Sequence, residues 1–183
     1  MKILILIDSL EQGGAETHVE LLCYHLKKLG ADMIVASTGG KIASRIKREG
    51  IKQIYLPSYS IHWQESGESP LSPLVSFGVA CNILKKIIRK EQPDIVHAHT
   101  RKTALVAQIV CKREKIPLVT TAHAIFTMSP PLNFLPWGDA TITVSEDIRD
   151  HILNNSLFPP RHIKIINNGV LIEEQIPNRN IPH

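Results

Sequence analysis

The sequence predicts an α/β fold, in which a doubly wound, mostly parallel sheet carries helices on both faces. Short β-branched runs alternate with helical periods along nearly the whole chain, the pattern of strand–helix–strand units joined by right-handed crossovers. Several of these runs are apolar at every position, as expected of parallel strands that helices cover on each side. Together the two observations indicate a Rossmann-like sheet.

Seven runs fit strands, each short and rich in β-branched residues. In chain order they are Lys2–Ile7, Asp32–Ser37, Gln53–Leu56, Asp94–Ala98, Leu118–Thr121, Ala140–Val144 and Ile163–Ile166.

Four helices are expected between these strands. The first begins near Ala15 and is closed by Gly30, and its apolar residues recur at three- and four-residue spacing. The others are an apolar stripe from Leu71 to Ile88, then Thr103–Arg113 and Ser145–Asn154. The connections 57–70 and 122–136 are longer than usual, and long loops at one edge of such a sheet often bind ligands.

Composition limits the function classes. The 183 residues suit one well-buried domain and are few for two. A net charge of +4 suits an anionic ligand or an acidic membrane face, but it is too small to indicate nucleic acid. Three cysteines without disulfide or metal spacing indicate reduced thiols and a cytoplasmic protein. The apolar N-terminal run is too short for a signal peptide, and no run is long enough to span a membrane.

A glycine pair follows the first strand. Gly13 and Gly14 precede a helix, and backbone N–H groups at a helix N-terminus attract phosphate. The third glycine of a dinucleotide fingerprint and the lysine of a P-loop are both missing, which disfavours NAD binding and nucleotide hydrolysis. A plain tight turn remains the alternative. Glu16 is awkward for a phosphate site and could simply favour the helix dipole.

Histidines stand at two strand ends. His97 and His99 lie two apart in "PDIVHAHT", so both point to one face, and His123 follows the fifth strand. We expect His97 to be a core residue with a backbone partner. His99 and His123 are candidates for hydrogen bonds to a sugar hydroxyl, since neutral imidazole donates without adding charge. No metal site is predicted, because no cluster has ligand spacing.

Other polar groups have simpler interpretations. Ser145 is expected to cap a helix, with the acids of the following turn favouring its dipole. Cations gather at two helix ends, where they complement the dipole or, less simply, contact anionic lipid. They are Lys85, Lys86, Arg89 and Lys90 in one group, and Lys112, Arg113 and Lys115 in the other.

The motifs together resemble a known family. "GGAE", "PDIVHAHT", "TAHA", "ITVSEDIRDHI" and "IKIINNGV" occur in the order found in family-4 glycosyltransferases. From Met1 to about Val170 the chain resembles the N-terminal domain of those retaining enzymes, which have the GT-B fold. In that fold two Rossmann-like domains face each other across a cleft, and the N-terminal one mainly receives the acceptor.

The resemblance implies a domain organisation and a reaction. Residues 1–170 would be the acceptor-side domain and residues 171–183 the start of a linker, with the C-terminal donor-binding domain absent. A sugar would pass, with retention, from a nucleotide-sugar to a polysaccharide or lipid-linked glycan precursor. No metal or other cofactor is expected, and the isolated domain should be inactive. The expected location is cytoplasmic, with peripheral contact at the inner membrane face.

The resemblance also implies site residues. Gly13 and Gly14 would approach the donor diphosphate, and His123 would contact the transferred sugar near the reacting centre. The acceptor and sugar contacts would be Glu16, His99, Thr100 and Ser145. One departure is Ala124, where many members have an acidic residue.

Two other functions stay open. One is a non-catalytic module that binds a sugar or phosphate in the crevice at the carboxyl edge of the sheet. The other is half of a GT-B-like nucleotide-sugar epimerase, which would need an acid–base carboxylate. Asp8 and Glu16 are the nearby candidates.

Overall fold

The computed structural model describes residues 1–57, 73–126 and 137–169. Most of the two long connections noted above, and the segment from residue 170 onward, lie outside these residues. The elements in chain order are β1 (Lys2–Leu6), α1 (Gly14–Lys28), β2 (Asp32–Ser37), α2 (Ala43–Arg48), β3 (Lys52–Tyr55), α3 (Pro73–Glu91), β4 (Ile95–Ala98), α4 (Arg101–Glu114), β5 (Leu118–Ala122), β6 (Ala140–Thr143), α5 (Glu146–Asn155) and β7 (Ile163–Ile165).

The seven strands form one sheet in the order β3-β2-β1-β4-β5-β6-β7, and every neighbouring pair is parallel. The predicted doubly wound α/β fold is therefore confirmed. The strand order reverses direction between β1 and β4, which are direct neighbours. In open α/β sheets, ligands bind outside the carboxyl ends of the strands at such a switch point.

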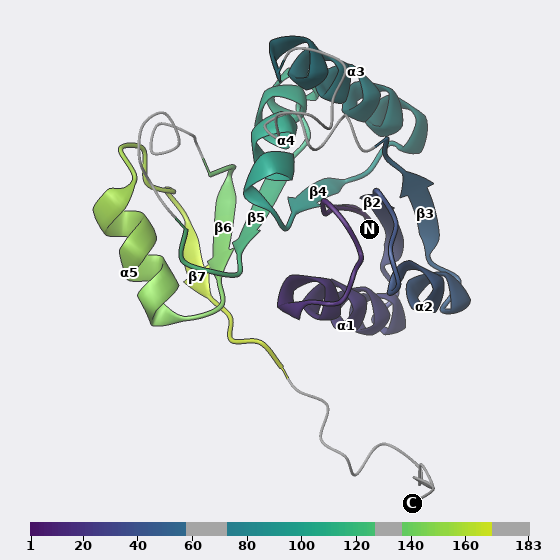
Figure 1. Ribbon diagram of the computed structural model, residues 1–183, viewed down its shortest axis with the longest axis horizontal. Coiled ribbons are helices and arrows are strands. Elements are labelled where there is room, and N and C mark those ends of the chain that lie inside the picture. The colour runs from purple at the N-terminus through teal and green to yellow at the C-terminus, as the bar shows by residue number, and fades with distance from the viewer. Residues whose placement is uncertain (58–72, 127–136, 170–183) are drawn as a thin grey trace, which may run out of the picture.

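Helices cover both faces of the sheet. Figure 1 shows α1 and α2 on one face and α3 and α4 on the other. Alternate residues of β1 serve the two layers: Ile3 and Ile5 pack in the cluster with α1 and α2, whereas Leu4 and Leu6 pack in the cluster with α3 and α4. This two-sided burial explains why β1 is apolar at every position.

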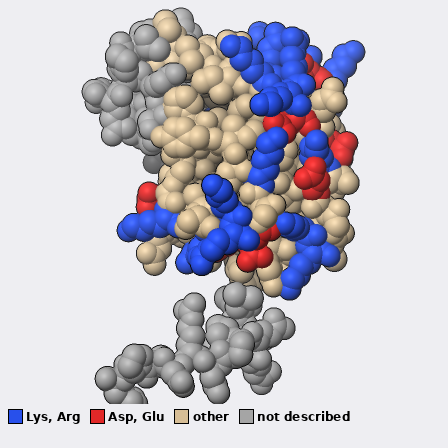
Figure 2. Space-filling model, turned by 90° about the vertical axis from the view of Figure 1, so that its right-hand side faces the viewer, with Lys and Arg blue, Asp and Glu red and all other residues tan. Residues whose placement is uncertain are grey.

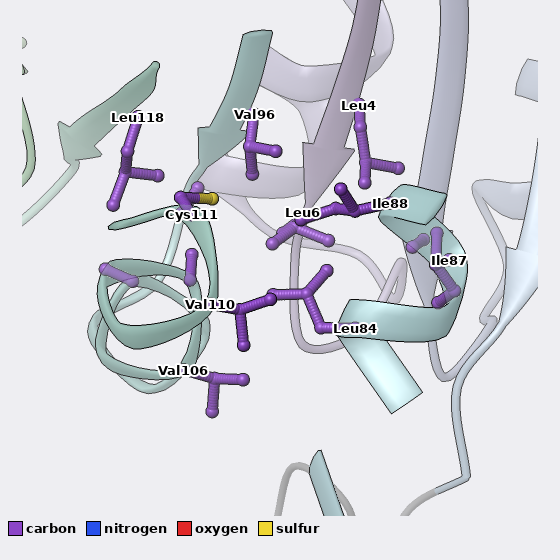
Figure 3. Close-up of a cluster of buried hydrophobic side chains, with 14 of the residues drawn as sticks. Leu4, Leu6, Leu84, Ile87, Ile88, Val96, Val106, Val110, Cys111 and Leu118 are labelled. Carbon is purple, nitrogen blue, oxygen red and sulfur yellow. The ribbon is translucent and has the colours of Figure 1, made fainter. Parts of the chain in front are cut away.

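The larger cluster joins the centre of the sheet to α3 and α4. In Figure 3, Leu4 and Leu6 face Leu84 and Ile88 of α3 and Val110 of α4. Burying an aliphatic side chain of this size contributes about 1.5–3 kcal/mol. This packing holds β1 and β4, the strands on either side of the switch point, as a rigid unit.

One helix was not predicted. α2 has six residues, and its apolar contacts come from Ile42 and Ile46, which are both fully buried. Two apolar residues four apart are too few to produce a helical period in the sequence. Packing of these two side chains against the α1 layer stabilises the helix in place of a longer apolar stripe.

Helix α4 begins two residues earlier than its apolar pattern suggests. Thr100 is the N-cap: its side chain accepts a hydrogen bond from the Thr103 backbone N–H, and Thr103 returns one to the Thr100 backbone. This capping box satisfies two N–H groups that the first turn leaves without partners.

The three cysteines lie on three different helices, α1, α3 and α4. Cys23, Cys81 and Cys111 are all free, and burial raises the pKa of Cys23 and of Cys111 to about 12. They are therefore thiols rather than thiolates at neutral pH. None of the helices in the described part of the chain is long and apolar enough to cross a membrane.

Candidate functional site

The glycine loop lies outside the carboxyl end of β1. Gly13 is the N-cap of α1 in an extended conformation, and no side chain caps the helix there. Gly14 is exposed, and a Cβ added to it would meet no atom within 4 Å. The first N–H groups of α1 therefore face a space that an anion can enter.

A pocket of about 360 Å³ adjoins this loop, and we name it the glycine pocket. Its lining comes from the loop, the first two turns of α1 and the segment after β7: Gln12, Gly13, Gly14, Thr17, His18, Leu21, Asn168 and Gly169. Asn168 and Gly169, at the end of the motif that resembles the family, thus return to the glycine loop.

The loop after β2 supports the glycine loop. Leu10 donates its N–H to the Gly39 carbonyl at 2.7 Å, and Ile42 donates to the Leu10 carbonyl at 2.8 Å. Gly40 has φ +140°, and a Cβ there would collide with the backbone of Leu10 and Glu11. Sequence reasoning missed this contact, although the adjacent glycines at 39 and 40 were a visible signal of a close backbone approach.

Three histidines meet at the carboxyl edge of the sheet. His99 Nδ1 and His123 Nε2 are 3.1 Å apart, at hydrogen-bonding distance. The ring centre of His18, from the first turns of α1, lies 4.9 Å from that of His123 and 5.6 Å from that of His99. His99 and His123, the candidates at two strand ends, thus lie beside the start of α1 that follows the glycine loop. His18, which sequence reasoning passed over, joins them because it lies one helical turn after Gly14.

Burial keeps these imidazoles neutral at neutral pH. The pKa of His123 falls to about 4, mainly through burial and then through the charge of His18. Burial also lowers the pKa of His99 well below its ordinary value, and neighbouring His97, His123 and His18 lower it further. His18 shows the same direction: burial lowers its pKa, and a hydrogen bond with Asn168 offsets part of that effect.

His97 is a core residue, as expected, but its partner differs from the expected backbone group. Its Nε2 lies 2.7 Å from Thr121 Oγ1, a side-chain hydroxyl on the neighbouring strand β5. Parallel pairing of β4 with β5 brings the two side chains to one face of the sheet. Its ring centre is 4.1 Å from that of His99, so the two rings are in contact.

A second pocket of about 210 Å³ lies beside His99 and His123, and we name it the histidine pocket. It is lined by Ala15, His99, Thr100, Arg101, Ala104, Thr120, Thr121, Ala122, His123, Ala124, Phe126 and Trp137. Arg101 lies over the Trp137 ring, 4.1 Å from its centre, a cation–π geometry. Burial lowers the Arg101 pKa to about 10, so it remains a cation at neutral pH. Sequence reasoning did not select Arg101.

The remaining predicted residues lie at different distances from the two pockets. Thr100 lines the histidine pocket, while its hydroxyl caps α4. Ser145 caps α5 by accepting a hydrogen bond from the Ile148 N–H at 3.3 Å, and it lines neither pocket. Glu16 lines neither pocket; its carboxylate lies against Gly13. The two pockets together form the candidate crevice. It is lined by five of the predicted residues, Gly13, Gly14, His99, Thr100 and His123, and not by Glu16 or Ser145.

A broader hollow of about 860 Å³ lies at the opposite edge of the sheet, beside the amino ends of β5, β6 and β7. Lys112, Lys115 and Arg161 are among the residues that line it. None of the predicted site residues reaches it. Because ligands of open α/β sheets bind at the carboxyl edge, the two smaller pockets are the better candidate site.

Comparison with known structures supports the fold. The chain is similar to a glycosyltransferase from Rickettsia africae, with a TM-score of 0.70 and 21% identity over 92% of this chain and 43% of that one. It is also similar to Anabaena HepE in complex with UDP-glucose (TM-score 0.66, 20% identity, 93% of this chain and 44% of that one). A third similar structure is a UDP-N-acetylglucosamine 2-epimerase (TM-score 0.59, 13% identity, 92% and 48%). The chain spans less than half the length of these three structures.

Sequence comparison identifies the family. No curated protein sequence matches the chain. The sequence model of Glycosyltransferase Family 4 matches residues 12–174, which include the glycine loop, the three clustered histidines and the segment after β7. Since the match covers most of the chain, this protein belongs to glycosyltransferase family 4.

Proposed function

We propose that the chain is the acceptor-side domain of a retaining glycosyltransferase, which moves a sugar from a nucleotide-sugar to a polysaccharide or lipid-linked glycan precursor. The observation that supports this most is the placement of the two pockets. The glycine pocket offers helix N–H groups that suit a diphosphate, and the histidine pocket offers neutral hydrogen-bonding groups that suit a sugar. His18 lines the glycine pocket, and its ring lies against those of His99 and His123, which line the histidine pocket, a placement that suits a nucleotide diphosphate-sugar spanning the two.

Each part of the crevice has a proposed role. The N–H groups at Gly13 and Gly14 stabilise the diphosphate as it leaves with the negative charge. His123 contacts the transferred sugar near the reacting centre, and His99 and Thr100 contact the sugar or acceptor. The acceptor hydroxyl attacks from the face that the diphosphate leaves, and the transfer step needs no metal.

Glu16 and Ser145 line neither pocket. In the proposal they border the acceptor site: Glu16 packs on Gly13, and Ser145 fixes the start of α5. A retaining transfer also requires cations on the diphosphate and contacts to the nucleotide, which we assign to a donor-binding domain. Without that domain, the 183 residues should be inactive.

The epimerase alternative needs an acid–base carboxylate in the crevice. The Asp8 carboxylate accepts a hydrogen bond from the Thr100 hydroxyl at 2.5 Å, so it is used in joining β1 to α4. Neither Asp8 nor Glu16 lines the glycine or histidine pocket. The structural similarity to an epimerase concerns the fold and does not favour that reaction.

We propose a cytoplasmic protein with peripheral contact at the inner membrane face. The support is the exposed group Lys85, Lys86, Arg89 and Lys90 on α3. Figure 2 shows Lys and Arg side chains gathered in clusters over one side of the molecule, with fewer Asp and Glu between them. Such cations attract anionic headgroups.

Nuclear magnetic resonance of the ¹⁵N-labelled chain tests the proposed site. We expect inorganic pyrophosphate and UDP to shift the backbone amide signals of Gly13 and Gly14, and UDP-glucose to shift the His123 ring signals as well. GDP and GDP-mannose test the alternative nucleotide. Shifts confined to the hollow beside Lys112 and Arg161, or no shift with any of these compounds, would contradict the proposal.

A transfer assay tests the division of labour. The chain alone, incubated with radiolabelled nucleotide-sugars and a membrane lipid fraction, should transfer no label. Robust transfer by these 183 residues would show that a second domain is not required.

A further inference from the structure

The cluster of His18, His99 and His123 has a property that sugar binding does not require. Three imidazoles converge from three separate elements: the start of α1, the end of β4 and the end of β5. One ring nitrogen of each lies within 4.8 Å of the others. In the part of the chain that the structure describes, this is the group whose donor atoms suit a bound metal ion.

The spacing matches that of a three-histidine metal site. With Zn–N bonds of about 2.0–2.1 Å and tetrahedral angles, ligand nitrogens lie about 3.3 Å apart and ring centres about 5 Å apart. Here His99 Nδ1 and His123 Nε2 are 3.1 Å apart. The three ring-centre distances are 4.9, 5.3 and 5.6 Å. Small side-chain rotations would therefore place all three nitrogens around one ion.

Two buried nitrogens of the cluster lack partners in the described part of the chain. They are His99 Nε2 and His123 Nδ1, and His99 is only 2% exposed. A buried polar atom without a hydrogen bond costs about 1–3 kcal/mol. These are the outer nitrogens of the two rings; the facing nitrogens, His99 Nδ1 and His123 Nε2, pair with each other and are the ones available to an ion.

The chemistry of the donors selects the ion. Three imidazoles and no carboxylate suit zinc, cobalt, nickel or copper, whereas magnesium and calcium prefer oxygen. Since the three side chains also line the glycine and histidine pockets, the remaining coordination position faces the crevice. Three protein ligands with one open position is the arrangement of solvent-accessible zinc sites.

We propose that His18, His99 and His123 bind one zinc-type divalent ion in the crevice, with its fourth position open to solvent. When the ion binds, the proton shared by His99 and His123 moves to an outer nitrogen of the same ring, so both facing lone pairs bind the metal and no proton is released. The ion occupies the space proposed above for the transferred sugar. Metal and sugar are therefore competing ligands of the crevice, although metal binding itself does not depend on the proposed function.

Titration of the chelator-treated chain with Zn²⁺ and Co²⁺ tests the site. We expect one ion per chain by calorimetry, and for Co²⁺ a visible absorption of the intensity typical of four-coordinate sites. Replacing His18 by alanine should weaken binding roughly 100-fold, because even an outer-shell change costs about 10–100-fold. The His123→Ala variant should behave alike.

The matched control is His25→Ala, on the same helix but exposed and outside the cluster. It should bind both ions as the unchanged chain does. Thermal unfolding of each variant, compared with the unchanged chain, separates lost ligation from lost fold. His18→Gln provides a second variant that keeps side-chain volume. Binding that is absent, that persists in His18→Ala, or that falls equally in His25→Ala would overturn the proposal.

Discussion

Thr100 donates its hydroxyl hydrogen to Asp8 Oδ1 across 2.5 Å, and this bond joins the two strands that flank the switch point. Asp8 follows β1, and Thr100 stands between β4 and α4. The same threonine accepts the Thr103 N–H as the N-cap of α4. One side chain therefore links the residue after β1 to the start of α4 and caps that helix.

Replacing Thr100 with valine should destabilise the domain, because valine has the shape of threonine but neither caps α4 nor bonds Asp8. The expected loss is about 1–2 kcal/mol of unfolding free energy, measured by urea denaturation. Thr100→Ser, which keeps the hydroxyl, is the control and should lose much less. No loss for valine would show that the hydroxyl contributes nothing, and an equal loss for serine would show that the methyl group contributes as much as the hydroxyl.

Gly14→Ala should reduce anion binding without harming the fold. No atom lies near the new Cβ, and alanine favours a helix by up to about 1 kcal/mol over glycine. The methyl group stands where a diphosphate would approach, so pyrophosphate affinity should fall about tenfold, the cost of one charge-assisted hydrogen bond. Gly78→Ala, in α3 and equally free of neighbours, is the control and should leave the affinity unchanged.

Gly40→Ala should destabilise the protein and disturb the glycine loop. The new Cβ meets the Leu10 backbone at a φ of +140°, so about 1–3 kcal/mol of strain is expected. Gly30→Ala is the control: φ is +86° there, but no atom lies within 4 Å. Denaturation measures the stability, and amide shifts at Gly13 and Gly14 report the loop. If Gly30→Ala costs as much, the contact with Leu10 contributes nothing.

Stability should fall as the pH is lowered from 6.5 to 4.5. The pKa of His97 drops from 6.5 to about 3 on folding, chiefly through burial. Between these two pH values the unfolded chain binds a proton at His97 that the folded chain does not bind. The stabilisation is present above pH 6.5 and is lost progressively toward pH 3. Each such histidine adds a slope of about 1.4 kcal/mol per pH unit.

Urea denaturation at several pH values measures this slope. The carboxylates whose pKa is lowered on folding, such as Glu91, start from 4.5, so most of their effect lies below the chosen range. Stability that is flat or rises on acidification to pH 4.5 would show that the buried histidines are protonated in the folded state.

Reversing charge on α3 should weaken contact with anionic membranes. Lys85→Glu with Lys86→Glu should lower binding to phosphatidylglycerol vesicles at least about tenfold, since each nearby cation contributes about 1 kcal/mol. Sedimentation with vesicles measures it. The pair Lys47→Glu and Arg48→Glu makes the same charge change on α2, on the other face of the sheet, and should have little effect. Equal losses for both pairs would indicate a general charge effect.

Much of the fold could be read from local patterns. The two-sided apolar runs at Ile3–Leu6 and Met33–Ala36 indicated covered parallel strands, and the structure has them in one parallel sheet. The short helix α2 could not be read in this way, because Ile42 and Ile46 acquire their meaning only from the α1 layer they pack against.

The site was partly visible for the same reason. Gly13, His99 and His123 each follow a strand, so the parallel arrangement alone places them at one edge. His18 and Arg101 stand inside helices, where their residue types are common and no spacing relates them to the other site residues. The sequence shows that position 40 is a glycine, but it does not show that this glycine lies against the Leu10 backbone.

By itself, the sequence determined the sheet, its helices and the edge at which chemistry could occur, because these follow from residue periodicity and from the direction of parallel strands. Only the tertiary structure decided which side chains share the crevice. His18 and His123 are separated by 105 positions, and their 4.9 Å ring distance depends on where the start of α1 lies relative to the end of β5. Such distances arise from the packing of whole helices and strands, and they cannot be predicted from the spacing of neighbouring residues in the sequence.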